Sequence, residues 1–277
     1  MATEKRPQTK LSKKKLQGQV AIITGASRGL GTGIAERFIR AGATVVLTAR
    51  SEEGLLTEAE RLRALGGTVL TLAADVSDPE QVQQVVDQTL EQYQRIDILV
   101  NNAGVIWPID EVAETDPDEW VYNLHVNLIG PFYASYCVLP VMIAQEYGRI
   151  INISSGLSRS AVAGLSAYGT AKAGLDHFTR ILALEVAKAG VTVNALHPGV
   201  IDTDMQTDLR SVDTGDSAVD LSIFHNYYES NQLVSPFVAG RLVYWLAGPW
   251  SKGHTGEIFT FRDEAWLAQV DQDLADS

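Results

Sequence analysis

The stretch that decides the fold is Val20-Ala-Ile-Ile-Thr-Gly-Ala-Ser-Arg-Gly-Leu-Gly31. Its first residues are apolar and mostly β-branched, which is typical of a buried parallel strand. The glycines that follow permit positive φ angles, and the helix that we expect next presents free backbone N–H groups at its start. A strand, a glycine-rich turn and a helix in this order predict a binding site for the pyrophosphate of a dinucleotide.

Apolar runs and amphipathic segments alternate along the rest of the chain. Predicted strands cover 20–23, 44–48, 68–73, 96–100, 149–154 and 191–196, with a last strand near Phe259. Predicted helices cover 30–42, 52–65, 79–94, 117–145 and 167–189. Strands that alternate with helices of this length form right-handed crossovers and a parallel sheet. We therefore expect a single α/β domain, a Rossmann-like doubly wound parallel sheet of about seven strands with helices on both faces and ligands at the strands' carboxyl ends.

Composition limits the possible partners. The chain has 277 residues, 45% of them hydrophobic, and a formal net charge of −12. Such an acidic chain is a poor match for nucleic acid, so we expect no nucleic-acid partner. No run of about 18 apolar residues occurs, which predicts no membrane partner. The one cysteine, Cys137, cannot form an internal disulfide, and no secretory signal is visible, so we expect a cytoplasmic protein.

The chain divides into three segments by composition. Residues 1–17 are rich in lysine and poor in apolar side chains, which predicts a disordered basic tail. Residues 18–262 contain all the predicted strands and form the expected catalytic domain. Within it, residues 204–232 combine apolar, aromatic and acidic side chains and are expected to form a lid over the substrate. Residues 263–277 are expected to form an acidic tail.

Tyr168 and Lys172 stand about one turn apart in a predicted helix, so their side chains share a face. A tyrosine hydroxyl has an ordinary pKa of about 10, and a nearby ammonium stabilises the phenolate and lowers that pKa. Ser155 follows a predicted strand and can bring a hydroxyl to the same place. A proton donor, a cation and a polarising hydroxyl suit reduction of a C=O group. Taken alone, the pair is also compatible with an ordinary helix face.

The end of the second predicted strand, Thr48-Ala49-Arg50, indicates which dinucleotide is bound. Enzymes that prefer NAD have an acidic residue here, which binds the ribose hydroxyls. This chain has none, and Arg28 lies in the glycine turn. Two guanidinium groups suit the 2′-phosphate of NADP(H), so we predict NADP(H) over NAD(H). In the alternative, Arg50 is a solvated loop charge and only Arg28 matters.

These motifs resemble those of the short-chain dehydrogenase/reductase family, and three others strengthen the resemblance. The others are Asn101-Asn-Ala-Gly104, Asn127 and the loop from Pro198 to Thr203. All of them follow in the family's order between residues 18 and 262, and the two arginines match its NADP-preferring branch. The resemblance implies an NADPH-dependent carbonyl reductase, which is an alcohol dehydrogenase in the reverse direction, and a homotetramer or homodimer.

The resemblance implies four catalytic residues. Tyr168 is the general acid in reduction and the general base in oxidation, and Ser155 orients and polarises the substrate carbonyl. Lys172 lowers the pKa of Tyr168 and binds the nicotinamide ribose. Asn127 supports a water-linked proton relay to Lys172. Because asparagine is unfavourable inside a helix, we expect a local break in the helix there.

The resemblance also implies how the chain holds its cofactor. Asp75 and Val76 contact the adenine, and Gly104 lets the backbone pass close by. The implied cofactor-binding residues are Gly25, Ser27, Arg28, Gly29, Leu30, Gly31, Arg50, Asp75, Val76, Asn102, Ala103, Gly104, Tyr168, Lys172, Pro198, Gly199, Val200 and Thr203. No metal is expected, because the histidines show no ligand spacing. His197, next to the Pro-Gly loop, is expected to be a packing residue.

The substrate is less sharply defined. Asp202-Thr-Asp-Met-Gln206 and the ending Thr255–Phe259 resemble sepiapterin reductases and bacterial benzil reductases. The acidic residue that anchors a pterin in the former aligns near Thr260, which is not acidic. The apolar and aromatic lid favours a medium-sized ketone, diketone or 3-oxo compound instead. Three alternatives stay open: a 3-oxoacyl thioester reductase, a cofactor-binding regulator without turnover, and a dehydratase or epimerase of the extended branch, whose glycine spacing differs.

Overall fold

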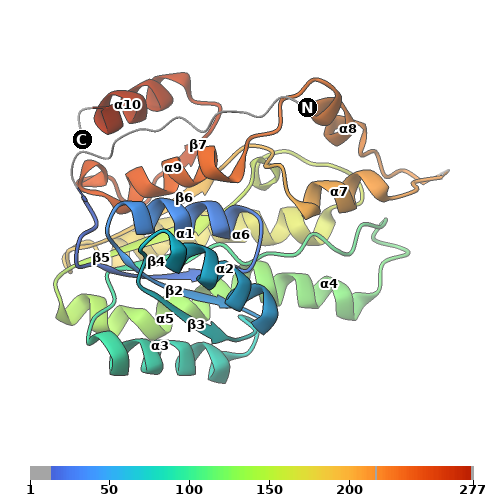
Figure 1. Ribbon diagram of the computed structural model, residues 1–277. Helices are drawn as coiled ribbons and strands as arrows, with labels where there is room; N and C mark the ends of the chain where they lie inside the picture. Colours follow the sequence, from blue (N-terminus) through green and yellow to red (C-terminus); the bar gives the residue numbers. More distant parts are fainter. Residues whose placement is uncertain (1–13, 216, 276–277) are drawn as a thin grey trace.

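A seven-stranded sheet forms the centre of the computed structural model, which describes residues 14–215 and 217–275. The strand order is β3-β2-β1-β4-β5-β6-β7, and every strand pair is parallel (Figure 1). The strands are β1 (Val20–Thr24), β2 (Thr44–Ala49), β3 (Val69–Ala73), β4 (Ile98–Asn101), β5 (Gly148–Ile153), β6 (Val191–His197) and β7 (Ile258–Thr260). The predicted doubly wound α/β fold is confirmed.

Helices cover both faces of the sheet, and an apolar core forms on each face. One core contains residues of α1, α2, α9 and α10, and the other contains residues of α3, α5 and α6. The helices are α1 (Leu30–Arg40), α2 (Glu52–Ala64), α3 (Pro79–Tyr93), α4 (Pro117–Leu124), α5 (Gly130–Ala144), α6 (Ser166–Glu185), α7 (Asp204–Ser211), α8 (Ser222–Glu229), α9 (Pro236–Ala247) and α10 (Glu264–Ala275), with short 3₁₀ turns η2 (Gly156–Ser158) and η3 (Pro249–Ser251).

Three helices begin where the sequence supplies a cap followed by proline. Asp78, Asp116 and Ser235 each accept a hydrogen bond from a backbone N–H of the first helical turn. The next residue is proline in each case, where it loses no helical hydrogen bond and its φ is already helical. These local signals account for the starts of α3, α4 and α9.

The long helix predicted at 117–145 is interrupted in its middle. A π-helical segment, η1 (His125–Ile129), separates α4 from α5. Pro131 has no N–H to donate to the carbonyl of Asn127, and the missing bond favours a wider turn. The local break expected at Asn127 is therefore present.

The same run, Pro117–Ala144, is the one helix among the described residues that is long and apolar enough to cross a membrane by length and composition. Within its most apolar window, 44% of the residues are buried inside the protein. The α5 part packs against α3, β4 and β5, as a core helix of an α/β fold does. The expected absence of a membrane partner stays a prediction.

The described part of the chain shows packed structure slightly before the predicted domain boundary at residue 18. Leu16 is fully buried, and its N–H donates to the carbonyl of Ala41 at 3.0 Å. The last residues of the predicted basic tail therefore pack on the end of α1. Residues 1–13, which carry the rest of that prediction, lie outside the described part of the chain.

The segment 263–277, expected to be an acidic tail, instead contains helix α10, which packs on the core (Figure 1). Trp266, Val270 and Leu274 are buried at a spacing of one helical turn, which the acidic composition concealed. The Trp266 ring lies 4.8 Å from the ring of Phe259 and 5.9 Å from that of Trp245, between centroids. The prediction of a tail is wrong because these apolar contacts attach the segment to the sheet.

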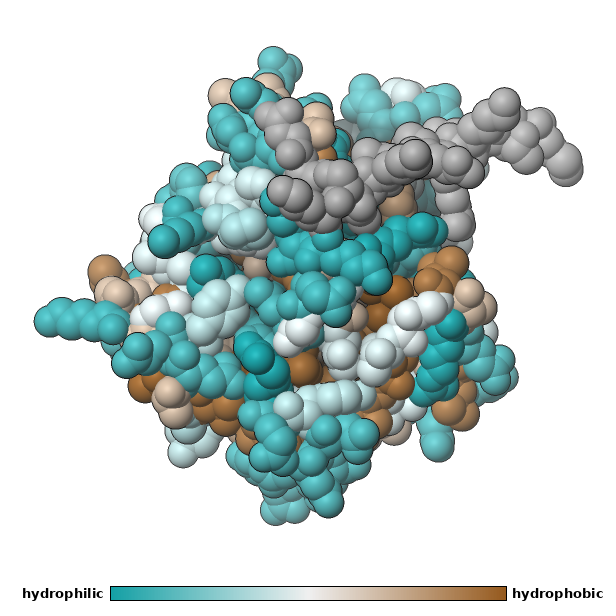
Figure 2. All heavy atoms as spheres, turned by 60° about the vertical axis from the view of Figure 1, so that its left-hand side comes forward, coloured by the Kyte–Doolittle hydropathy of each residue, from teal (hydrophilic) through white to brown (hydrophobic). Residues whose placement is uncertain are grey.

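The surface combines hydrophilic regions with separate apolar patches. On the face shown in Figure 2, hydrophilic side chains predominate and hydrophobic ones gather in several places between them. Among the described residues, α5 and α6 expose a group of large apolar side chains. This group, the α5/α6 patch, consists of Phe132, Tyr136, Ile143, Ile181 and Leu184.

Replacing the residue that anchors α10 should destabilise the whole domain. We expect Trp266→Ala to lower the free energy of unfolding by about 3–5 kcal/mol, since it leaves a cavity among buried aromatic rings. Gln269→Ala, on the exposed side of the same helix, should change it by less than about 0.5 kcal/mol. Urea unfolding measures both. Equal stabilities of the two variants would mean that α10 is not part of the core.

Candidate active site

A cavity of about 1180 Å³ opens at the carboxyl ends of the strands. It lies where the strand order reverses between β1 and β4, which is the usual ligand site of a doubly wound sheet. Ser155, Tyr168 and Lys172 line it, as does every predicted cofactor-binding residue except Gly31. Among the predicted catalytic residues, Asn127 does not line it.

The glycine turn leaves its backbone open because neighbouring chain segments approach it closely. Gly25 has a φ of 64°, and a Cβ there would lie 2.7 Å from the Cα of Ala103. The turn and the start of α1 thus fit a pyrophosphate, which needs free N–H groups and no side chain in the way. Gly31, predicted to contact the cofactor, has a different use. A Cβ there would lie 2.4 Å from the carbonyl oxygen of Gly25, so its small size lets α1 pack against the turn.

Side-chain hydrogen bonds join the glycine turn to the end of β4. The Thr24 hydroxyl accepts from the N–H groups of Asn102 and Ala103 at 2.9 and 3.0 Å. The Asn102 amide donates to the carbonyls of Thr24 and Gly25 at 2.8 and 3.0 Å. The two predicted motifs therefore form one rigid wall of the cavity.

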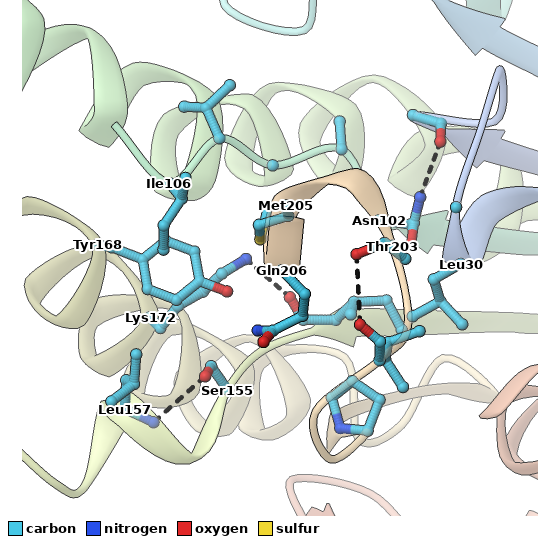
Figure 3. Close-up of a pocket in the computed structure, with 18 of the residues that line it drawn as sticks. Leu30, Asn102, Ile106, Ser155, Leu157, Tyr168, Lys172, Thr203, Met205 and Gln206 are labelled. Atoms are coloured by element: carbon cyan, nitrogen blue, oxygen red, sulfur yellow. Dashed lines mark hydrogen bonds between the residues drawn. The ribbon is translucent and has the colours of Figure 1, made fainter. Parts of the chain in front are cut away.

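Tyr168 and Lys172 project from the same side of α6 into the site, as their spacing predicts (Figure 3). The Lys172 Nζ lies 5.4 Å from the centroid of the Tyr168 ring and donates to the carbonyl of Ile153, at the end of β5, at 2.9 Å. Ser155 begins the turn that follows β5, where its Oγ accepts from the N–H of Leu157 at 3.2 Å. In Figure 3 the hydroxyls of Tyr168 and Ser155 point toward the same space.

Burial dominates the titration of both α6 residues. Burial raises the pKa of Tyr168 to about 12, and a hydrogen bond with Ser155 acts in the opposite direction. Burial lowers the pKa of Lys172 to about 8, and the carboxylate of Asp176 acts in the opposite direction. The net shift of the Tyr168 pKa is upward because the loss of water around the phenol is its largest cause, and the lowering expected from Lys172 stays a prediction.

Asn127 lies in the π-helical segment, where its side-chain nitrogen makes hydrogen bonds and its side-chain oxygen has no partner among the described residues. Its Nδ2 donates to the carbonyl of Val105 at 2.8 Å and to the Oδ1 of Asn123 at 2.9 Å. Its Oδ1 is buried and accepts no hydrogen bond from the described residues. A Cβ on Gly104 would lie 2.9 Å from that oxygen and 3.8 Å from the Lys172 Nζ, so the two groups approach the same glycine. Such an orphaned oxygen fits a bound water.

The two arginines predicted to select the cofactor lie at the adenosine end of the cavity and are exposed. Arg28 pairs with Asp204, the first residue of α7, at 3.1 Å. Arg50 donates to the hydroxyl of Tyr122 at 2.6 Å. No acidic residue ends β2, so both guanidinium groups fit an added phosphate, although Arg28 must exchange its present partner.

Sequence reasoning missed a buried group of residues beside Lys172. Asp176, Ser158 and His197 meet there through hydrogen bonds, and His197 also lines the cavity. His197 is thus both the packing residue that was expected and part of the site. The helical spacing of Lys172 and Asp176 was visible in the sequence, but the approach of Ser158 from another element was not.

The predicted lid at 204–232 contains α7 and α8, which lie side by side (Figure 1), and residues of both helices line the cavity. Met205, Leu209 and Phe224 line the cavity from the lid, and Leu209 and Phe224 pack in an apolar cluster that also contains Tyr168. Figure 3 shows Met205 and Gln206 across the site from Tyr168. Arg262, after β7, lies at the rim and donates to the hydroxyl of Tyr227.

Residues 19–213 match the family described as short chain dehydrogenase. The chain belongs to the short-chain dehydrogenase/reductase family. It is 37% identical to the 3-oxoacyl-acyl-carrier-protein reductase FabG of Vibrio harveyi over 242 residues, which are 87% of this chain and 95% of the relative. The predicted family is confirmed, and with it the prediction of an oxidoreductase that acts on carbonyl or hydroxyl groups.

Solved structures of short-chain dehydrogenases/reductases resemble the fold closely. A variant actinorhodin polyketide ketoreductase with NADPH is 31% identical, with a TM-score of 0.81 over 88% of this chain and 95% of its own. Xylitol dehydrogenase bound to NAD+ is 26% identical, with a TM-score of 0.82 over 89% and 98%. Membership of the family therefore implies a nicotinamide cofactor. The two structures contain different ones, NADPH in the ketoreductase and NAD+ in xylitol dehydrogenase.

Proposed function

We propose that this protein is an NADPH-dependent carbonyl reductase, reversible as an alcohol dehydrogenase, that acts on a ketone, diketone or 3-oxo compound. The observation that carries the proposal is the buried pair Tyr168 and Lys172 in the wall of the cavity. A phenol with a pKa of about 12 keeps its proton at neutral pH, so it can donate that proton to a carbonyl oxygen.

Each catalytic side chain has one task in this proposal. The hydroxyls of Ser155 and Tyr168 hold the substrate oxygen, and Tyr168 gives up its proton as negative charge develops there. The ammonium of Lys172 stabilises the resulting phenolate. Asn127 holds a water with its free oxygen and so connects Lys172 to solvent. A bound nicotinamide supplies the hydride.

The preference for NADPH rests on Arg28 and Arg50. Both are exposed at the cavity, and the end of β2 carries no carboxylate that would bind a ribose hydroxyl. Arginine suits a phosphate because its planar group can donate two parallel hydrogen bonds. The related ketoreductase structure contains NADPH, which is in line with this preference.

The expected substrate follows from the apolar part of the cavity lining. Ile106, Leu157, Met205 and Phe224 form an apolar wall, which suits the carbon skeleton of a medium-sized ketone or diketone. A 3-oxoacyl thioester is the second candidate, since the Vibrio harveyi relative is a 3-oxoacyl reductase. A regulator without turnover is disfavoured, because a protein with no catalytic role has no need of the complete set of Asn127, Ser155, Tyr168 and Lys172.

A homodimer or homotetramer is also proposed, with the α5/α6 patch as its contact surface. Tyr136 and Leu184 are 67% and 79% exposed although both are large and apolar. The ring of Phe132 packs edge-on against Phe178 at 6.1 Å, which extends the patch from α5 to α6. Apolar faces of this kind on soluble proteins usually contact another subunit.

Removing the proposed proton donor should abolish reduction and spare binding. We expect Tyr168→Phe to lower kcat for carbonyl reduction by about 10²- to 10⁴-fold, the usual contribution of a general acid. NADPH affinity, followed by fluorescence titration, should stay within about threefold because nearly all other contacts persist. Tyr244→Phe, at a buried tyrosine outside the site, is the matched control and should keep full activity. Undiminished turnover in Tyr168→Phe would refute the assignment.

Removing one arginine should erase the cofactor preference. We expect Arg50→Ala to lower kcat/KM for NADPH by about 10- to 100-fold, since a hydrogen bond to a charged group contributes about 1.5–3 kcal/mol. The value for NADH should not change, and Arg180→Ala on α6 should affect neither. Parallel assays with both cofactors measure the ratio. A wild-type protein that uses NADH better than NADPH would overturn the proposal.

A charge placed in the α5/α6 patch should separate the subunits. We expect Leu184→Asp to convert the assembly to monomers in light-scattering measurements, because it buries an unpaired carboxylate in the interface. Leu56→Asp, at an exposed leucine of α2, should leave the assembly intact. A monomeric wild type, or an assembly that survives Leu184→Asp, would exclude this surface as the interface.

A further inference from the structure

A buried carboxylate joins three elements beside the active site. Asp176 lies one turn after Lys172 on α6 and is 3% exposed. Its Oδ2 accepts a hydrogen bond from the Ser158 hydroxyl at 2.6 Å and lies 2.9 Å from the Nε2 of His197. Ser158 ends the turn η2, and His197 ends β6. A side chain that connects three elements in the interior is well placed to fix their relative positions.

The group does not have the geometry of a nucleophilic serine. His197 approaches both partners with the same nitrogen, Nε2, at 3.2 Å from the Ser158 Oγ and 2.9 Å from Asp176. A histidine that activates a serine uses one ring nitrogen for the serine and the other for the carboxylate. The Ser158 hydroxyl instead donates a hydrogen bond directly to Asp176. The group therefore holds elements together.

The connection through Ser158 reaches Ser155. Both residues belong to the same tight turn, in which the N–H of Ser158 donates to the Ser155 carbonyl at 3.0 Å. The Ser155 Oγ accepts from the N–H of Leu157 in that turn. Because the turn is so short, attaching Ser158 to α6 also fixes the hydroxyl of Ser155 relative to Tyr168.

Asp176 also acts on Lys172 through its charge. Burial alone would raise the pKa of Asp176, but the hydrogen bonds with His197 and Ser158 act against burial and the pKa is lowered, so the carboxylate stays ionised. Its negative charge opposes the loss of the Lys172 proton. Among the described residues, the titratable groups around it are Lys172 and, one turn further, Tyr168 on α6, together with His197 from β6. The turn η2 and the residue after β5 contribute the uncharged hydroxyls of Ser158 and Ser154.

We propose that Asp176 is a positioning residue for carbonyl reduction, which holds the Ser155 turn against α6 and keeps Lys172 protonated. The proposal rests on the proposed function, because Asp176 is taken to position Ser155 and to keep Lys172 charged, and both groups support Tyr168 as the proton donor. It separates two effects that different substitutions can test. Asp176→Asn removes the charge and weakens the connection to the turn, whereas Ser158→Ala weakens that connection and leaves the charge.

The first measurement is the pH dependence of kcat for reduction of the best carbonyl substrate with NADPH. In the wild type, the rate should fall as pH rises through about 8, because Lys172 loses its proton there. In Asp176→Asn this fall should move to lower pH by about one unit, and kcat should drop by about 10- to 100-fold because Ser155 is displaced. In Ser158→Ala the fall should stay in place. Glu185→Gln, which removes an exposed charge from the same helix, should match the wild type.

The second measurement is hydrogen–deuterium exchange of the segment 155–160, which needs no catalysis. Exchange should be faster in both Asp176→Asn and Ser158→Ala than in the wild type and in Glu185→Gln. Unchanged exchange in Ser158→Ala overturns the positioning role, also if Asp176→Asn fails to fold. A pH profile of Asp176→Asn that coincides with the wild-type profile overturns the role of the charge. A wild type that reduces no carbonyl refutes the proposed function, and the exchange data still decide whether Asp176 holds the turn.

Discussion

The site depends on one contact: a lysine ammonium, almost fully removed from water, that donates to the carbonyl at the end of a central strand. Lys172 is 4% exposed and bonds Ile153 at 2.9 Å. Moving an ammonium out of water is costly unless polar groups surround it, so α6 must dock where such a carbonyl is available. Since β5 is paired on both sides, by β4 and β6, its end is rigidly placed. Tyr168 and the Ser155 turn take their positions from this docking.

Patterns that are local in sequence predicted most of the fold and the centre of the site. The strands, the glycine turn and the Tyr168–Lys172 pair are each written within a few consecutive residues, and all of them lie where they were expected. Three features could not be read this way. The contact of Asp176 with Ser158 and His197 joins elements that are distant along the chain. The pKa of Tyr168 depends on burial, which spacing does not reveal. Helix α10 was not predicted because its three buried apolar residues are interspersed with Glu264, Asp271 and Asp273 in an acidic segment.

In the proposed function, a third apolar cluster, separate from the two cores of the sheet, links substrate recognition to reactivity. It contains Tyr168 together with Leu209 and Phe224 of the lid, and Ile106 from the loop after β4. The lid therefore packs on the ring of the proposed proton donor itself. A substitution in the lid that changes which carbonyl fits will also change the surroundings of the phenol, so specificity and rate cannot vary independently here.

The burial of Tyr168 and Lys172 also affects how the Tyr168 hydroxyl regains its proton after each reaction cycle. A phenol that gives its proton to a substrate must regain one before the next cycle, and Tyr168 is only 8% exposed. The interruption of the long helix at η1 places the buried, unpartnered Oδ1 of Asn127 against Gly104, which the Lys172 Nζ also approaches. A water bound to this oxygen would give protons a second path to Lys172 and Tyr168, which does not pass through the substrate cavity. Protons could then enter while substrate or product still occupies the cavity.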